Sequence, residues 1–402
     1  MNVSTHDRQR GRSGSSLRRL GIVAASVALL VAACGSDDSS SDDASDTAAP
    51  ATTATSESAA ATTTGSDSTS TTGSEPAGDL DGSGTSICLA TSEAGISDRS
   101  FNQQAWEALQ AAESSYGAKV SYLSKSGSID AMQIGQQFVA SGDCTMIIGM
   151  GYDFAEMVGT LSAANPDIQF VLVDDTLETP ADNAVSVTFA TDEAAFLGGY
   201  LAAGVSKSGI VGVYGNQPIP PVQLYMDGYA YGVDYYNSTK GTSVKVLGWD
   251  PAAQTGQFVG SFTDVNQGKI ISQSQLQENA DVIFAVSGPI AQGTAVAVRE
   301  AGGPAADKYM LWVDSDGCVA DPGNCDVVLS TVEKKIDSAL TQIIEQTLGG
   351  AFPAGEYVGT LANEGVGLAD FHDLAADVPA ELQSELTDLA VGDAGGTVTV
   401  GP

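Results

Sequence analysis

The stretch "SICLATSEAGISDRSFNQQAWEAL" (residues 86–109) decides the fold, because an apolar run, a loop and a helical pattern follow one another in it. The run at 86–91 predicts a buried strand, and the apolar spacing from residue 101 onward predicts a helix. Ser100 and Gln103 fit a capping box at the start of that helix. The stretch is therefore typical of the strand-to-helix unit of an α/β protein.

Asp98, Phe101 and Asn102 lie at the junction between this strand and the start of the helix. A helix that begins there offers free backbone N–H groups, and open α/β sheets bind ligands beyond the carboxyl ends of their strands. We therefore expect the three residues to belong to a ligand site. The competing interpretation is an acidic helix cap next to a phenylalanine that packs under the sheet.

Apolar strand-like runs and helical patterns alternate along the chain to about residue 350. Strands are expected in the runs "SICLAT", "KVSYLS", "TMIIGMG", "FVLVDD", "AVSVTFA", "GIVGVYG", "VKVLGW", "DVIFAVSG" and "KYMLWVDSD". Helices are expected near 101–115, 129–141, 153–164, 192–205, 221–236, 266–279, 290–301 and 333–350. The strands read as continuous apolar runs, as parallel sheets covered on both faces require. Since about 315 residues exceed one compact core, we predict an α/β fold of two lobes, each a doubly wound parallel sheet.

Successive strand runs end in small, acidic or turn-forming residues, namely "TSEAG", "MGYDF", "VDDT", "YGNQPIP", "VSGPIAQG" and "VDSDG". In two facing α/β lobes these ends point into one space. A single Asp after a strand is usually a helix cap. Six such ends favour a common cleft.

The N-terminal 33 residues have the pattern of an export signal. Five arginines precede the apolar stretch "LGIVAASVALLVAA" (20–33), whose 14 residues are too few for a comfortable membrane span. The stretch ends in "VAAC", which matches the lipobox of bacterial lipoproteins and predicts a lipid on Cys34. The alternative is an ordinary secretory signal followed by a chance cysteine. We expect residues 1–33 to be a signal peptide and the protein to be anchored on the extracytoplasmic face of the cell membrane.

Residues 34–85 are dominated by Ser, Thr, Ala, Gly and Asp and carry no Lys or Arg. Such a segment cannot bury enough apolar surface to offset chain entropy, so we predict a disordered tether.

The chain without residues 1–33 has 11 basic and 49 acidic residues, a formal charge of −38. This charge excludes a nucleic-acid partner bound through phosphate neutralisation.

Four cysteines remain after Cys34, an even number that favours two disulfides in an exported protein. Cys318 and Cys325 flank a turn-rich loop that a bridge could close. Cys88 and Cys144 lie at strand-like runs and could pair if those strands are adjacent, or could be two buried thiols.

The chain contains two histidines, His6 in the leader and His372. It therefore lacks the residues for a His-based triad or a His-rich metal site, and its acids are spread over separate strand ends. We expect no catalytic residues, no metal and no cofactor, and hence a binding protein.

Several motifs recur in the order known from one family. They are "GISDRSFNQQAWEAL", "NPDIQFVLVDD", "VTFATDEAAFLGGYLAA", "GSFTDVNQGK", "ADVIFAVSG" and "VDSDG…VVLSTVEKKID". Over about residues 86–370 the chain resembles the basic membrane protein family, the PnrA-like nucleoside-binding lipoproteins of ABC importers. The resemblance implies a type I periplasmic binding fold with a three-strand hinge. Lobe 1 would hold 86–190 plus 334–349, and lobe 2 would hold 191–333 plus 350–402.

The resemblance also implies a set of ligand-binding positions: Asp98, Phe101, Asn102, Asp174, Phe262, Gly288, Asp314 and Lys334. In the family, two aromatic rings stack on a purine base, a role that falls to Phe101 and Phe262. Asp98 and Asn102 would read the base edge, Asp314 and Lys334 would contact the ribose, and Gly288 would let the backbone approach the ligand. Asp174 matches the family's acid at its strand end.

Alternatives remain open at several positions. Phe262 could be a core residue, with Tyr152, Tyr225 or Trp249 supplying the second ring instead. Asp316 could replace Asp314, Lys334 could be a surface lysine, and Asp98 could be a cap only. The first loop reads Ser-Glu-Ala-Gly (92–95) where the family usually has Asp-x-Gly-Gly, and the loop 318–325 is longer than the family pattern.

The function implied is capture of a neutral nucleoside, preferably a purine one, for an ABC permease. Stacking gains ~1–3 kcal/mol per base, and carboxylates suit sugar hydroxyls because they only accept hydrogen bonds. Several acids and a single lysine disfavour a phosphorylated ligand. We expect a monomer. The alternatives are a tethered sensor that regulates a membrane partner, and a binder of sugars or other small polar metabolites.

Overall fold

The computed structural model describes residues 80–394. The predicted signal peptide, the lipidation site at Cys34, the tether up to residue 79 and the last eight residues lie outside the described part. The tether was predicted to reach residue 85, but Gly82 is buried and its N–H donates to the Tyr116 carbonyl at 2.7 Å. Residues 80–85 therefore belong to the folded part.

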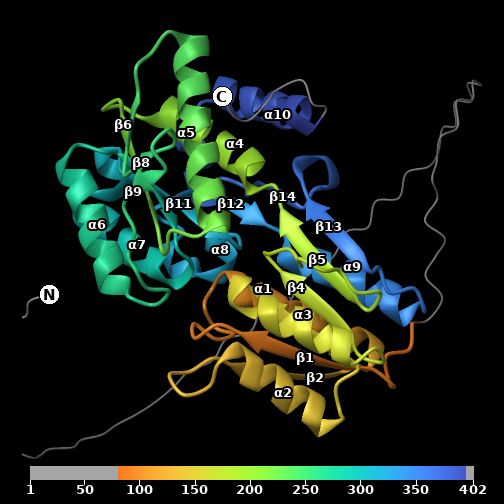
Figure 1. Ribbon diagram of the computed structural model, residues 1–402. Helices are drawn as coiled ribbons and strands as arrows, with labels where there is room; N and C mark the ends of the chain where they lie inside the picture. Colours follow the sequence, from red (N-terminus) through yellow and green to blue (C-terminus); the bar gives the residue numbers. More distant parts are fainter. Residues whose placement is uncertain (1–79, 395–402) are drawn as a thin grey trace, which may run out of the picture. The chain divides into compact units, whose positions relative to one another are not determined.

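The first sheet consists of six parallel strands in the order β13-β5-β4-β3-β1-β2 (Figure 1). Its strands are β1 (Ser86–Thr91), β2 (Lys119–Ser124), β3 (Met146–Met150), β4 (Gln169–Val173), β5 (Ala184–Phe189) and β13 (Gly355–Gly359). The four central strands are buried almost throughout, which explains their continuous apolar sequences.

The second sheet repeats this plan in the order β14-β12-β11-β10-β6-β7, with β14 alone antiparallel to its neighbour. Its strands are β6 (Ile210–Gly215), β7 (Lys245–Leu247), β10 (Val282–Val286), β11 (Tyr309–Asp314), β12 (Val328–Lys334) and β14 (Val366–Leu368). A two-stranded ribbon, β8 (Trp249–Asp250) with β9 (Thr255–Gly256), is separate from both sheets.

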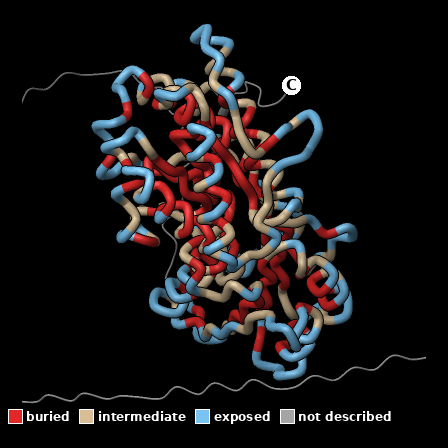
Figure 2. The backbone as a smooth tube through the Cα atoms, turned by 90° about the vertical axis from the view of Figure 1, so that its left-hand side faces the viewer, coloured by how far each residue is buried: buried red, intermediate tan, exposed pale blue. Residues whose placement is uncertain are grey.

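Helices cover both faces of each sheet. The helices are α1 (Phe101–Tyr116), α2 (Ala131–Ser141), α3 (Ala155–Ala164), α4 (Thr191–Val205), α5 (Pro220–Lys240), α6 (Val265–Gln277), α7 (Ala291–Glu300), α8 (Gly317–Ala320), α9 (Ile336–Leu348) and α10 (Ala380–Ala394). In the first sheet, α1 and α9 pack on one face and α2 and α3 on the other. In the second sheet the pairs are α4 with α5 and α6 with α7, and α10 packs on α4. Figure 2 shows the resulting buried interior beneath exposed helices and loops.

The chain passes between the two sheets three times, after β5, after β12 and after β13. The predicted two-lobed, doubly wound α/β fold with a three-strand hinge is therefore confirmed. The predicted lobe boundaries differ at two points. Gly355–Gly359, assigned to lobe 2, pairs with β5 in the first sheet, and Lys334, assigned to a helix of lobe 1, ends β12 in the second sheet.

The described part of the chain contains two disulfides, Cys88–Cys144 and Cys318–Cys325. The first joins β1 to the residues just before β3, because these two strands are adjacent in the sheet. The second closes the loop that follows β11. Within residues 80–394, no helix is both long enough and apolar enough to cross a bilayer.

Candidate ligand-binding cleft

A cavity of about 800 Å³, including its mouth, is lined by loops at the carboxyl ends of strands from both sheets. We call this cavity the cleft. All eight positions implied by the family resemblance line it: Asp98, Phe101, Asn102, Asp174, Phe262, Gly288, Asp314 and Lys334. Residues that are more than 200 positions apart in the sequence thus meet in one space.

The loop before α1 is organised by Asp98, whose side chain is 3% exposed. One carboxylate oxygen accepts the N–H groups of Ser100 and Gln103, at 3.1 and 3.0 Å, and the other accepts the N–H of Asn102 at 2.9 Å. Burial raises the pKa of Asp98, and these N–H donors oppose the rise. Asp98 is thus the cap of α1 as well as a residue of the cleft.

The predicted capping box of Ser100 and Gln103 is wrong. Ser100 makes no capping bond with its side chain, because Asp98 already satisfies the helix start. The Ser100 hydroxyl instead donates to Asp314 at 2.7 Å and so joins the two lobes.

Asn102 has an unused acceptor. Its Nδ2 donates to Asp98 at 2.8 Å and to the Ser92 hydroxyl at 3.1 Å, while its Oδ1 is buried without a hydrogen-bond partner in the described structure. A buried oxygen in this state is costly unless a ligand donates to it. Because Asn102 is one of the residues that line the cleft, this oxygen is a candidate acceptor for a ligand.

Lys334 occupies the centre of the site, and its side chain is 2% exposed. Its Nζ lies 2.9 and 2.8 Å from the two carboxylate oxygens of Asp174 and 3.9 Å from an oxygen of Asp314. The ammonium also faces three rings, with centroids of Phe101, Tyr225 and Phe189 at 5.3, 5.2 and 5.7 Å. The idea that Lys334 is a surface lysine is wrong.

Asp174 and Asp314 both have left-handed backbone conformations, with φ of 68° and 65°. Asp174 follows β4 and Asp314 ends β11, and both carboxylates line the cleft. Such a conformation is uncommon for residues other than glycine and is concentrated at functional sites. Burial raises the pKa of Asp174 above its usual value, and Lys334 opposes this rise.

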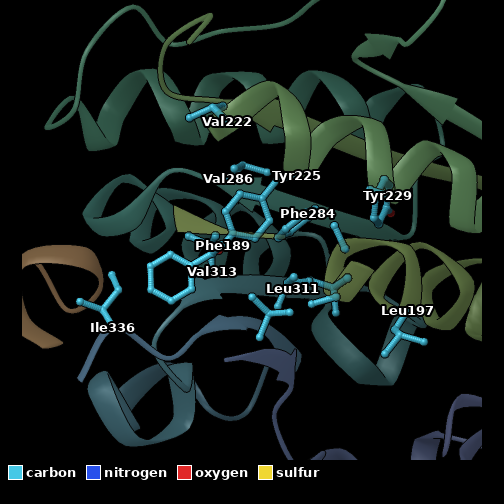
Figure 3. Packing of buried hydrophobic residues seen from close by; sticks show 14 of the residues in the cluster. Phe189, Leu197, Val222, Tyr225, Tyr229, Phe284, Val286, Leu311, Val313 and Ile336 are labelled. Carbon is cyan, nitrogen blue, oxygen red and sulfur yellow. The ribbon is translucent and has the colours of Figure 1, made fainter. Parts of the chain in front are cut away.

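Two hydroxyl groups hold the Asp314 carboxylate. Ser100 donates to one oxygen and the Tyr225 hydroxyl donates to the other at 2.9 Å. Burial, followed by the negative charge of Asp314, raises the pKa of Tyr225 well above 10, so this phenol remains a donor. Figure 3 shows Tyr225 among the buried side chains of Phe284, Val286 and Val313. The alternative acid, Asp316, does not line the cleft; it caps α8 and pairs with His372.

Phe101 and Phe262 both line the cleft, from the first and the second lobe respectively. Of the alternative rings, Tyr152 lines its mouth and is 40% exposed, and Tyr225 is committed to Asp314. Trp249 does not line it, because its ring packs on Phe258 and its Nε1 donates to Asp227 at 2.8 Å.

Gly288 and Gly151 follow strands of different sheets and both have positive φ, 44° and 95°. A Cβ on Gly288 would lie 3.6 Å from the Ser100 side chain, and one on Gly151 would lie 3.8 Å from the Phe101 ring. Space is therefore adequate, and backbone conformation is what favours glycine at both places.

Several residues of the cleft were not named as ligand-binding positions: Ser92, Met150, Asp153, Asn216, Pro221 and Ser287. All of them except Pro221 stand in the strand ends "TSEAG", "MGYDF", "YGNQPIP" and "VSGPIAQG", so the signal was present in the sequence. The bond from Ser100 to Asp314 had no such signal, because it joins residues 214 positions apart.

One cluster of metal-ligand residue types occurs in the described part, formed by Asp316, Cys318 and His372. Cys318 is bonded to Cys325 and offers no thiolate, which leaves two ligands. The cluster does not include any residue that lines the cleft.

The profile of the family described as "ABC transporter substrate-binding protein PnrA-like" matches residues 87–390, which is most of the chain. The chain belongs to this family of substrate-binding proteins. It is 26% identical over 316 residues to the "ABC transporter nucleoside-binding protein BmpA" of Lactococcus lactis, covering 75% of this chain and 86% of the relative. It is 27% identical over 323 residues to the "CD4+ T-cell-stimulating antigen" of Listeria innocua, covering 76% and 86%.

Solved structures support the same fold. An ABC transporter solute-binding protein of Aeropyrum pernix K1 matches with a TM-score of 0.64 at 24% identity, covering 78% of this chain and 87% of that one. One from Conexibacter woesei matches with a TM-score of 0.61 at 21% identity, covering 79% and 98%. These neighbours establish the type I periplasmic binding fold.

Proposed function

We propose that the protein is an extracytoplasmic lipoprotein that binds a neutral nucleoside, preferably a purine nucleoside, and delivers it to an ABC permease. One observation carries the proposal. Lys334 links carboxylates from both sheets, Asp174 and Asp314, beside the ring of Phe101 in a single cleft. A flat base and a sugar rich in hydroxyls need these two kinds of contact side by side.

The base half of the ligand would lie between Phe101 and Phe262. Stacking on an aromatic ring contributes about 1–3 kcal/mol per base without selecting the base. Selection would come from the unpartnered Oδ1 of Asn102, which requires an N–H donor on the base edge. The name of the Lactococcus relative, a nucleoside-binding protein, supports this ligand class.

The sugar half would lie against Asp174, Asp314 and Lys334. A carboxylate accepts hydrogen bonds from vicinal hydroxyls, and an ammonium donates to a hydroxyl oxygen. The acids that line the cleft are Asp98, Asp153, Asp174 and Asp314, whereas Lys334 is the one basic residue that lines it in the described structure. This balance disfavours a phosphate group, so a nucleoside is preferred over a nucleotide.

The fold and the predicted anchor support a role in transport. In two-lobed binding proteins, ligand stabilises the closed arrangement of the lobes. The family description supports a permease partner, and the relatives include an "Uncharacterized lipoprotein" of Pyrococcus furiosus, 28% identical over 197 residues. A lipid on Cys34 and the tether would keep the binding lobes near the membrane.

Calorimetric titration of the purified protein tests the proposal. The panel is adenosine, guanosine, inosine, cytidine, uridine, guanosine monophosphate and ribose. We expect a purine nucleoside to bind most tightly and ribose and the nucleotide to bind far more weakly. Equal binding of ribose and nucleosides would favour the sugar-binding alternative, and no binding by any member would contradict the proposal.

A further inference from the structure

The two lobes also meet outside the ligand-contacting residues. Arg99, in the loop before α1 of the first lobe, forms an ion pair with Asp321 of the second lobe. Next to this pair, Ser315 donates its hydroxyl to the Ser100 carbonyl at 3.2 Å. Neither Arg99 nor Asp321 lines the cleft. The pair therefore contributes to lobe contact without touching a ligand.

Asp321 is held rigidly for this contact. It lies inside the loop closed by the Cys318–Cys325 disulfide, and its carboxylate accepts a hydrogen bond from Asn324 Nδ2 at 2.7 Å. Asn324 in turn accepts from Arg299 Nη1 at 2.8 Å. Only 10% of the Asp321 side chain is exposed. A carboxylate fixed in this way loses little freedom when a cation approaches it.

Arg99 is directed toward Asp321 by an unusual backbone. Its φ is 57°, in the left-handed region, and its N–H donates to Gln103 Oε1 at 3.1 Å. Non-glycine residues adopt this region rarely, and such outliers are concentrated at functional positions. The loop that carries Phe101 and Asn102 into the cleft therefore also carries Arg99 to the opposite lobe.

We propose that Arg99 and Asp321 are positioning residues that hold the lobes closed and slow the release of ligand. The proposal rests on the proposed function, because it assumes that the cleft binds a ligand on closure. Partly exposed ion pairs contribute little to the free energy of association. Removing one partner of a mostly buried charge loses more free energy and raises the off-rate. We expect loss of the pair to speed ligand release about fivefold.

The test uses substitutions that are compatible with the positive φ of Arg99. Arg99→Asn removes the charge, and Asn tolerates positive φ better than most residues. Arg99→Lys keeps the charge and should release ligand at nearly the wild-type rate. Lys269→Asn is the matched control, because Lys269 pairs with Glu300 within the second lobe. Stopped-flow measurement with the tightest nucleoside should give a faster off-rate for Arg99→Asn at an unchanged on-rate, and no change for Lys269→Asn.

A double-mutant cycle separates this role from a general structural one. Arg99→Asn and Asp321→Asn should each speed release, and the double variant should be no faster than either single variant. The exchange Arg99→Asp with Asp321→Arg should restore part of the slow release. Fully additive effects, or an off-rate for Arg99→Asn equal to that of the wild type, would overturn the proposal.

A ligand-free measurement distinguishes failure of this proposal from failure of the proposed function. Spin labels at the exposed positions Ser115→Cys and Gln277→Cys, in a Cys34→Ser background, report the separation of the lobes. We expect Arg99→Asn to shift the distance distribution toward longer values even if no tested nucleoside binds. Identical distributions for the wild type and Arg99→Asn would overturn the proposal.

Discussion

Asp174 and Asp314 occupy equivalent places in the two sheets, since both stand at the carboxyl end of the third strand in the sheet order, Asp174 just after β4 and Asp314 as the last residue of β11. Their backbones match, with φ of 68° and 65°. Their partners do not. Asp314 is held by two hydroxyl donors, whereas Lys334 is the hydrogen-bond partner found for the Asp174 side chain in the described structure.

This difference indicates a division of roles between the lobes. Asp314 is fixed by Ser100 and Tyr225, and its bond to Ser100 belongs to the lobe contact itself. Asp174 keeps lone pairs available beside a single ammonium. We infer that Asp174 accepts ligand hydroxyls most directly, while Asp314 also maintains the closed arrangement.

The largest effect is expected from Asp174→Asn. It removes the carboxylate closest to a buried ammonium and should destabilise the protein by about 3 kcal/mol, since breaking a buried ion pair is costly. Nucleoside affinity should fall about 100-fold, because hydrogen bonds to a charged group contribute about 1.5–3 kcal/mol each. Urea unfolding and calorimetry measure the two effects. Asp175→Asn, at the neighbouring acid that does not line the cleft, is the control.

The next effect concerns the rings of the two lobes. Phe101 packs against the main core cluster and faces Lys334, whereas Phe262 belongs to none of the described core clusters. Phe101→Ala should weaken nucleoside binding at least tenfold and Phe262→Ala less, since a rigid ring stacks with less loss of freedom. Both are measured by calorimetry, with Tyr122→Ala as a control on an exposed ring. Unchanged affinity would remove Phe101 from the site.

A smaller effect is expected from Asp314→Asn. The amide oxygen can still accept from Ser100 or Tyr225, so much of the network survives. Affinity should fall about fivefold to tenfold, clearly less than for Asp174→Asn, because part of the charge-assisted bonding is lost. Calorimetry on both variants in parallel compares their losses of affinity. The reverse order of effects would show that the roles assigned to the two acids are exchanged.

The smallest effect is the pH dependence. In the proposed function the ionised Asp174 accepts hydrogen bonds from ligand hydroxyls, and burial raises the pKa of this group. Affinity should therefore rise with pH through this elevated pKa and level off above it, and its loss on acidification should begin at higher pH than for an ordinary Asp, whose pKa is about 3.9. Titrations across mildly acidic pH with wild type and Asp174→Asn measure this. The variant should show a weaker dependence.

The lobes could be predicted because buried parallel strands have continuous apolar sequences that are easily recognised. Short or exposed strands left no such run. β13, with its burial alternating along Gly355–Gly359, and the three-residue β14 were both missed. The fully buried β12 was missed as well, although it is central in its sheet. The helix expected from residue 333 begins at Ile336, since Glu333 and Lys334 continue a buried strand whose neighbour only the fold supplies.

The cleft was predictable where family motifs or strand ends marked it. Contacts between the lobes could not be predicted from the sequence, since they depend on how two distant segments of the chain meet. Ser100 shows the limit: its spacing to Gln103 predicted a local cap, but Asp98 supplies the cap and Ser100 reaches Asp314 instead. Local patterns compete with tertiary contacts, and here the tertiary contact prevailed.

The central claim is that carboxylates of the cleft hold the hydroxyls of a nucleoside whose base is stacked on Phe101. The most direct test compares a ribonucleoside with its 2′,3′-dideoxy counterpart, by calorimetry, on the wild type and on Asp174→Asn. The wild type should prefer the ribonucleoside by about 100-fold, and most of this preference should disappear in the variant. Equal affinity of the wild type for both ligands would contradict the account.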